Sequence, residues 1–180
     1  FVPGDVNLRH PLYLGLPTLE AHRSLHPLAA LMDMVKMSVE HIYIGDGGLK
    51  EITARQFCHY IKEQTVLLRG RAETIDFRYV QGDHENRQDA ARDVIRSAAA
   101  RFKAIPEIHP ENTIARSKGV ITIDNSDYAR YMGEIQITKT DLVADSKVNR
   151  VGQVITDDID LIAYIGAGQK FRIENEKQYD

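Results

Sequence analysis

The sequence has 180 residues and contains no tryptophan, a single cysteine and no long apolar run. Because Cys58 has no second cysteine to pair with, an internal disulfide bond is excluded, which is compatible with a reducing cytoplasm. No apolar run is long enough to cross a bilayer, so no membrane partner is expected. The net charge of −3 provides no basic surface of the kind that binds nucleic acid, which argues against that class of partner.

The residues that are present form an ordinary globular composition, with 43% hydrophobic and 27% charged residues. The length allows one or two small domains. The chain begins at Phe1 rather than at a methionine, which indicates a fragment or a mature piece of a longer protein. We therefore expect part of a larger globular protein.

Residues 1–64 alternate helical and strand-like patterns. Pro27 predicts the start of a helix through Val39, because proline is tolerated in a first turn, and a second helix is predicted over residues 53–63. Between them, residues 41–46 form a short β-rich run that enters a glycine-rich loop. This rhythm is typical of a parallel α/β sheet or barrel, and a barrel needs eight such units. The first third is therefore predicted to be the last turns of a larger barrel.

Residues 65–180 show a different pattern. Residues 66–69 are apolar and strand-like, and the apolar spacing of residues 89–102 predicts a helix. Five further strands are predicted, at residues 119–124, 132–140, 148–155, 159–165 and 170–174. Closely spaced strands of this kind favour an antiparallel barrel or a sandwich.

Asp46 is the first candidate for chemistry, because it follows the predicted strand 41–46 directly. In α/β barrels, side chains at the C-terminal ends of strands face the active site, so Asp46 is a candidate catalytic carboxylate or a ligand to sugar hydroxyls. The alternative is a tight turn that Asp46 closes with an Asx hydrogen bond. The loop is not a phosphate-binding GxGxxG sequence, because the third glycine is missing.

The long loop before Pro27 carries further charged candidates. Asp5 and Arg9 follow the first strand-like piece, and Glu20 and Arg23 lie further along. Either arginine could clamp a phosphate or a carboxylate in a bidentate manner, and the alternative is a set of ordinary solvent-exposed charges. Loops of this length between short elements are often functional.

Metal and cofactor binding are not expected. His22 and His26 are four residues apart, but Pro27 disfavours a helix at His26, and no glutamate lies between the two histidines as in an HExxH zinc motif. We therefore predict surface histidines. Arg92 and Arg96 would lie on one side of the predicted helix 89–102, either as a two-pronged anion site or as ordinary surface arginines.

The segment 118–137 reads as a strand, a polar crossing and a second strand. The crossing contains Asn125, Tyr128, Arg130, Tyr131 and Glu134, which is more hydrogen-bonding chemistry than a turn requires. Tyrosine and arginine gather at recognition surfaces, and a domain-packing patch is the alternative.

Several of these segments together resemble one family. They are residues 12–23 (LYLGLPTLEAHR), 42–46 (IYIGD), 84–87 (HENR), 93–97 (DVIRS), 119–137 (GVITIDNSDYARYMGEIQI) and 144–149 (ADSKVN). The family is that of the bacterial 6-phospho-N-acetylmuramidases, long carried as uncharacterised outer surface proteins. The resemblance implies the C-terminal segments of a TIM-type (β/α)8 barrel at residues 1–64, followed by a cyclophilin-like β-barrel domain at residues 65–180. The chain would then be the C-terminal half, with the N-terminal barrel half missing.

The resemblance also implies an activity, namely cytoplasmic cleavage of the disaccharide 6-phospho-N-acetylmuramyl-N-acetylglucosamine during peptidoglycan recycling. The partner would be this small phosphorylated amino-sugar disaccharide, and the fragment alone would be inactive. Glycosides are usually cleaved by two carboxyl groups, for which Asp46 and then Glu20 are the candidates. Candidates for substrate binding are Asp5, Arg9 and Arg23 in the first part and Arg96, Asn125 and Glu134 in the second.

Two other interpretations remain open. The second domain could be a non-catalytic sugar-binding or peptide-binding module, because fold alone does not determine function. It could also be a structural β-barrel module that braces the barrel or makes a homodimer. In the structural case, Tyr128, Tyr131 and Glu134 should be buried against protein, with no cavity beside them.

Overall fold

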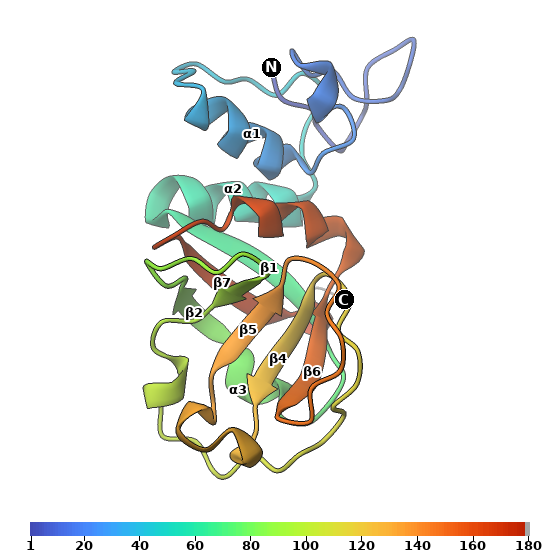
Figure 1. The fold of residues 1–180 in the computed structure, drawn as a ribbon. Coiled ribbons are helices and arrows are strands. Elements are labelled where there is room, and N and C mark those ends of the chain that lie inside the picture. Colours follow the sequence, from blue (N-terminus) through green and yellow to red (C-terminus); the bar gives the residue numbers. More distant parts are fainter. Residues whose placement is uncertain (179–180) are drawn as a thin grey trace. The chain divides into compact units, whose positions relative to one another are not determined.

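The computed structural model describes residues 1–178, which belong to two compact units (Figure 1). Unit 1 comprises Phe1–Glu63, and unit 2 begins at Gln64. Within the described residues, no helix is both long and apolar enough to span a membrane.

Unit 1 is built from helices and irregular chain. It contains the short 3-10 helix η1 (Glu20–His22) and the α-helices α1 (Pro27–Lys36) and α2 (Glu51–Glu63). Helix α1 begins at Pro27 as predicted, with the His26 ring nitrogen Nδ1 accepting a hydrogen bond from the Leu28 backbone N–H. It ends at Lys36 rather than Val39, because Ser38 adopts a left-handed backbone conformation with φ of 60°.

The small core of unit 1 surrounds Val2, Ala30 and Met34, with Leu19 and Ile44 among the residues packed against it. Within unit 1, β-pairing is limited to isolated bridges, a parallel one between Val2 and Ile44 and an antiparallel one between Val6 and Gly48. The β-rich run at residues 41–46 therefore makes a single bridge instead of a strand.

Unit 2 is organised around one mixed sheet of seven strands in the order β2-β7-β1-β6-β4-β5-β3. The parallel pair is β1–β7, and every other neighbouring pair is antiparallel. In Figure 1 the sheet bends, so that β4, β5 and β6 lie in front of β1 and β7. The strands are β1 (Thr65–Ala72), β2 (Gly82–Glu85), β3 (Val94–Arg96), β4 (Val120–Asp124), β5 (Ile135–Thr138), β6 (Val148–Val154) and β7 (Lys170–Asn175).

Short helices connect several of these strands, and one of them packs against the sheet. The connecting helices are α3 (Phe77–Val80) and the 3-10 helices η2 (Ala100–Phe102), η3 (Ser126–Tyr131) and η4 (Thr156–Tyr164), and a further 3-10 helix, η5 (Glu176–Gln178), follows β7. Phe77 of α3 is fully buried, and its ring occupies the space that a side chain would need at Gly152, where an added Cβ would lie 2.5 Å from Phe77 Cδ2. Glycine at this strand position therefore allows the helix to approach the sheet.

The predicted fold class is wrong. Unit 1 contains no strands of a (β/α)8 barrel among its described residues, and unit 2 is one open mixed sheet instead of a closed cyclophilin-like β-barrel. Strands β2 and β3 are its edges, with an isolated backbone bridge between Asn86 and Ser97 just beyond their ends. Alternating polarity identifies strands, but it does not determine whether the sheet closes.

Two element predictions in unit 2 are also wrong. Residues 89–102 form β3 and η2 instead of one helix, because Val94–Arg96 pairs with β5 and buries Ile95 completely. Residues 159–165 lie largely in η4 instead of a strand. Its Asp158 is fully buried and accepts hydrogen bonds from the Arg69 backbone N–H at 2.7 Å and from the Arg69 guanidinium at 2.6 Å. Tertiary pairing outweighs the local pattern at both places.

Candidate functional site

Asp46 in unit 1 is 7% exposed and holds three separate parts of the loop together. Its Oδ2 accepts hydrogen bonds from the backbone N–H groups of Gly4 at 2.9 Å and Leu16 at 2.8 Å, and its Oδ1 accepts one from Arg9 at 2.9 Å. Burial works to raise the pKa of Asp46, but the three donors outweigh it and hold the pKa below its ordinary value. The carboxylate therefore stays ionised with both oxygens engaged.

Glu20 forms an exposed ion pair with Arg23. Arg23 donates from Nε and Nη2 to the two carboxylate oxygens of Glu20, each at 2.6 Å, and from Nη1 to the carbonyl oxygen of Gly15 at 2.7 Å. The hydrogen bond from Arg23 is the main cause that lowers the pKa of Glu20. These two predicted site residues thus bind each other in the structure.

Asp5 stabilises the start of α2 from outside the helix. Its Oδ1 accepts from the Lys50 backbone N–H and its Oδ2 from the Thr53 hydroxyl, both at 2.6 Å. This arrangement satisfies backbone and side-chain donors at a helix N-terminus, as a capping residue does. The guanidinium of Arg9 is exposed and makes no hydrogen bond or ion pair within the described residues.

The two histidines of the loop are buried, at 1% and 8% exposed, so the prediction of surface histidines is wrong. His22 lies 2.9 Å from Asp33 of α1 through its Nε2, and His26 caps α1. Residues 1–178 contain no group of three or more histidine, cysteine, aspartate or glutamate side chains placed to hold a metal ion.

In unit 2, the polar crossing places two carboxyl groups beside each other. Asp124 is the last residue of β4 and Glu134 comes directly before β5, and the Asp124 N–H donates to the Glu134 carbonyl oxygen at 2.9 Å. Between them η3 turns the chain, with Ala129 at φ of 51° and Gly133 at φ of 85°. Both carboxyl side chains are buried, at 2% and 6% exposed.

The Asp124 carboxyl group has an unusual proton affinity. Burial, and then the negative charges of Glu134 and Asp145, raise its pKa to about 8. Its Oδ1 is buried without a hydrogen-bond partner among the described residues. Asp124 is therefore a neutral carboxylic acid at pH 7 that can donate a hydrogen bond.

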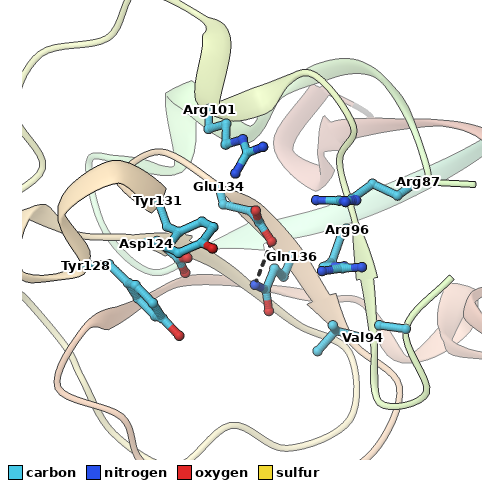
Figure 2. A pocket seen from close by; sticks show the side chains of 10 residues that line it. Arg87, Val94, Arg96, Arg101, Asp124, Tyr128, Tyr131, Glu134 and Gln136 are labelled. Carbon is cyan, nitrogen blue, oxygen red and sulfur yellow. Dashed lines mark hydrogen bonds between the residues drawn. The ribbon is translucent and has the colours of Figure 1, made fainter. Parts of the chain in front are cut away.

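A cavity of about 540 Å³ opens beside this carboxyl pair (Figure 2). Figure 2 shows Arg87 and Arg96 on one side, Asp124, Tyr128 and Tyr131 on the other, and Glu134 and Gln136 between them. Gln136 Nε2 donates to Glu134 Oε1 at 3.2 Å. The lining residues are Arg87, Ala91, Val94, Arg96, Arg101, Asp124, Tyr128, Tyr131, Glu134 and Gln136.

Strand pairing explains why these side chains share a cavity. Arg96 of β3 pairs with Gln136 of β5, and Gln136 pairs on its other side with Thr122 of β4. Directly paired residues and residues two apart lie on the same face of a sheet, so Val94, Arg96, Glu134 and Gln136 face one way. The intervening Ile95, Ile135 and Ile137 are buried on the opposite face.

The arginines of the cavity differ in what they contact. Arg87 donates to both carboxylate oxygens of Asp89, from Nε at 2.8 Å and from Nη2 at 3.0 Å, and Arg96 Nη2 donates to Asp89 Oδ2 at 3.1 Å. Arg101 makes no ion pair within residues 1–178, and its guanidinium lies 5.6 Å from the centre of the Tyr131 ring. Arg87 and Arg96 thus form a basic side of the cavity, with Asp124 on the opposite side (Figure 2).

The structure brings two of the predicted substrate-binding residues, Arg96 and Glu134, into this cavity. Asn125 is elsewhere. It is fully buried, and its amide donates to the Ser146 carbonyl oxygen at 2.9 Å and to Asn149 Oδ1 at 2.7 Å. Of the two alternatives for Arg92 and Arg96, the ordinary surface arginine holds for Arg92, which pairs with Asp93 at the surface. The expectation for a structural module, no cavity beside Tyr128, Tyr131 and Glu134, is wrong.

Sequence reasoning missed Arg87, Arg101, Asp124 and Gln136 as lining residues. For Asp124 and Gln136 the signal was available, since both lie in the polar alternation on either side of the crossing. Arg87 and Arg101 come from irregular segments whose positions depend on β3, and the segment containing β3 was predicted as a helix.

Comparison with known proteins gives two family matches. The family model described as "6-phospho-N-acetylmuramidase, C-terminal" matches residues 64–174, and the one described as "6-phospho-N-acetylmuramidase, N-terminal" matches residues 1–59. The expectation that the chain is the family's C-terminal half is therefore only partly right, because the N-terminal model matches as well. Comparison with curated proteins finds no match.

Two solved structures are similar over nearly the whole chain. One is a conserved protein from a locus in Enterococcus faecalis with an unknown function, at 42% identity and a TM-score of 0.89, covering 97% of this chain and 48% of that one. The other is an uncharacterized B. cereus protein, at 21% identity and a TM-score of 0.75, covering 96% of this chain and 52% of that one, a likeness that shows the fold alone. The chain spans about half the length of these two proteins.

Proposed function

The chain belongs to the 6-phospho-N-acetylmuramidase family, and from this we propose that the full-length protein is a glycosidase of peptidoglycan recycling. Its proposed substrate is the disaccharide 6-phospho-N-acetylmuramyl-N-acetylglucosamine. The observation that carries the proposal is the cavity of unit 2, where Asp124 lies opposite Arg87 and Arg96 and Glu134 lies between them. A phosphorylated sugar needs both kinds of group, guanidinium donors for the phosphate and carboxyl groups for hydroxyls or for the glycosidic oxygen.

The proton on Asp124 supports a role in the chemistry. A glycosidase uses one carboxyl group that carries a proton at working pH and one that is ionised, and their environments separate the two pKa values. Asp124 supplies the protonated member, because burial raises its pKa to about 8. We assign the proton-donating role to Asp124 and place Glu134 beside it as a substrate-binding carboxyl group.

Asp46 and Glu20 remain the other catalytic candidates, but their contacts lead us to expect different effects of substitution than at Asp124. Asp46 has both oxygens occupied by backbone donors, and Glu20 is clamped by Arg23. An Asp46→Asn variant would damage the loop before it changed any chemistry. Activity lost with the loop structure intact would identify a catalytic group, whereas activity lost together with it would identify a structural one.

The experiment measures turnover of the phosphorylated disaccharide by the full-length protein and by Asp124→Asn, Asp46→Asn and Glu20→Gln variants. We expect Asp124→Asn to lower kcat by about 100-fold or more, the usual range for loss of a general acid. Absence of disaccharide cleavage by the wild-type protein would refute the proposed function. Normal turnover in Asp124→Asn would refute its assigned role, and normal turnover in both other variants would exclude Asp46 and Glu20.

A second candidate function is non-catalytic binding of a phosphorylated sugar by unit 2. The observation that favours it is that every residue lining the cavity belongs to unit 2. Calorimetric titration of the 180-residue chain with N-acetylmuramic acid 6-phosphate separates the two functions. Binding by this chain, combined with no cleavage by the full-length protein, would favour the module.

A further inference from the structure

Arg87 and Arg96 both line the cavity, and both donate hydrogen bonds to the carboxylate of Asp89, which is not itself a lining residue. We propose that these two arginines form the anion site for a ligand's phosphate or carboxylate group, and that Asp89 occupies the anion's place until the ligand displaces it. The inference rests on the proposed function in taking the cavity as a substrate site. Beyond that function, it names the two guanidinium groups that receive the anion and the residue that competes with it.

The contacts of Asp89 are those expected of a bound anion. Arg87 holds both carboxylate oxygens through Nε and Nη2, at 2.8 and 3.0 Å, which is the two-pronged geometry that guanidinium groups use for carboxylates and phosphates. Arg96 reaches the same Oδ2 at 3.1 Å and the Asp89 carbonyl oxygen at 3.0 Å. One oxygen atom of Asp89 therefore bridges two guanidinium groups that line the cavity.

Asp89 is held weakly enough to leave. Its side chain is 64% exposed, and it lies in the irregular segment between β2 and β3. Exposed ion pairs contribute only about 0–1 kcal/mol each, because water screens them and the side chains lose freedom. Apart from a hydrogen bond to its own backbone N–H, the Asp89 carboxylate has no partner among the described residues other than these two arginines.

An incoming phosphate can satisfy more donors than Asp89 does. Arg96 Nε is buried without a hydrogen-bond partner in the described part of the chain, and Arg101 has no ion pair there. Phosphate presents three oxygens and up to two negative charges, against the two oxygens and single charge of Asp89. It can therefore take over the Asp89 contacts and add the donors that Asp89 leaves unused.

The opposite side of the cavity restricts what else the ligand can carry. Asp124 lies across from the arginines and Glu134 lies in the middle of the cavity, so a second anionic group away from the arginines would be repelled or left without donors. Hydroxyl groups, in contrast, can hydrogen-bond to Glu134, to Gln136 and to the protonated Asp124. The ligand class is a sugar or polyol with one anionic group at the arginine side.

The test is calorimetric titration of the 180-residue chain with three probes that separate the anionic groups. N-acetylglucosamine 6-phosphate carries only a phosphate, N-acetylmuramic acid carries only a carboxylate, and N-acetylglucosamine is uncharged. We expect the wild type to bind at least one charged probe and to bind the uncharged sugar more weakly. A chain that binds neither charged probe, as wild type and as Asp89→Asn, would overturn the proposal.

Asp89→Asn is the decisive variant, and Asp93→Asn is its matched control. Both remove one negative charge from the same segment, but Asp93 pairs with Arg92, which is not among the lining residues. Asp89→Asn should tighten binding of the charged probe about threefold to tenfold, the range set by the ion pairs that the anion no longer has to break. Equal tightening in both variants, or none in Asp89→Asn, would mean that Asp89 does not compete for the site.

A direct readout distinguishes displacement from a general charge effect. The carboxyl ¹³C signal of Asp89 should shift on saturation with the phosphate probe, while that of Asp93 should stay in place. Arg87→Gln should weaken binding of charged probes by about tenfold, the loss of one bidentate charged contact. None of these measurements uses hydrolysis, so failure of the glycosidase assay and failure of the anion site are separate results.

Discussion

The proton on Asp124 can be tested by replacing the side chain with an amide of the same shape. Asp124→Asn removes the ionisable group and stays neutral at every pH. Burial and the neighbouring Glu134 and Asp145 raise the folded-state pKa of Asp124 from 3.8 to about 8. In the unfolded chain the group loses its proton near its ordinary pKa, so between these two pH values the folded state binds more protons than the unfolded state.

The sign of the effect follows from this difference. The contribution of Asp124 to stability is fully present below about pH 4 and is lost as the pH rises to about 8. Each pKa unit is worth about 1.4 kcal/mol, so the free energy of unfolding of the wild type, relative to Asp124→Asn, falls by at most about 4 kcal/mol between pH 5 and pH 8. Because the carboxyl group lines a solvent-accessible cavity, where water weakens electrostatic effects, we expect the observed fall to be about 2–3 kcal/mol.

The assay has to report on unit 2. Urea unfolding followed through the methyl signals of Ile121 and Ile123, both fully buried in β4, meets this requirement. The advantage of Asp124→Asn should grow from pH 5 to pH 8 and then level off. A carboxyl ¹³C titration of the wild-type protein should place the midpoint of Asp124 near pH 8, with the signal assigned by its absence in the variant.

Asp127→Asn is the control, because it removes a carboxylate from the same crossing at an exposed position. A stability advantage that grows with pH in Asp127→Asn as well would mean that the effect is not specific to the buried carboxyl group. If the advantage of Asp124→Asn is constant or shrinks between pH 5 and pH 8, or if Asp124 titrates below pH 5, the buried-acid interpretation is refuted. The proton-donating role proposed for Asp124 would then be refuted as well, because it requires a carboxyl group that is protonated at working pH.

Three further substitutions test other parts of the structure. Burial lowers the pKa of His84 to about 4, so its contribution to stability is fully present above pH 6.5 and is lost as the pH falls from 6.5 to 4. This loss lowers the free energy of unfolding by about 3 kcal/mol at most, and urea unfolding of His84→Gln should not show it. Asp46→Ala leaves three backbone N–H groups without their acceptor, should cost unit 1 about 3 kcal/mol or more, and should speed hydrogen exchange at Gly4, Arg9 and Leu16. Gly152→Ala drives a Cβ to 2.5 Å from Phe77 and should cost about 1–3 kcal/mol in urea unfolding, whereas Gly166→Ala, with nothing within 4 Å, should change stability little.

The effects of His84 and Asp124 on stability oppose each other between about pH 4 and pH 6.5. His84 stabilises the fold increasingly as the pH rises through this window, and Asp124 stabilises it less. The wild-type stability curve can therefore be flat there while both groups are strongly perturbed. Only the differences between variants and wild type reveal the two contributions.

Much of the strand content of unit 2 could be predicted from alternation and turn residues. The runs at residues 66–69, 119–124, 148–155 and 170–174 are confirmed as β1, β4, β6 and β7, with shifts of a few residues at their ends. These strands carry several large apolar residues that are fully buried, so their pattern reflects the core directly. The start of α1 at Pro27 is confirmed for a similarly local reason.

Elements that depend on distant partners could not be predicted. Strand β2 has the sequence GDHE, which carries no apolar alternation, and is held by its pairing with β7. Its His84 stacks on Phe171 of β7 with ring centres 5.1 Å apart, a contact that spans 87 residues of sequence (171 − 84). Whether the sheet closes depends on the edge strands β2 and β3, and neither was predicted as a strand.

The candidate site shows how one misassigned strand hides a set of functional residues. The alternation of Glu134, Ile135, Gln136 and Ile137 already places the glutamate and the glutamine on one face of β5. Had residues 94–96 been recognised as the antiparallel partner of β5, the same rule would have put Arg96 opposite Gln136, on the face that carries Glu134. The helical pattern that obscured this pairing is the apolar spacing of Ala90, Ala91, Val94, Ile95 and Ala98, which would share one face of a helix. Pairing of Val94–Arg96 with β5 outweighs that pattern because it buries Ile95, and the same pairing brings Arg96 to the cavity.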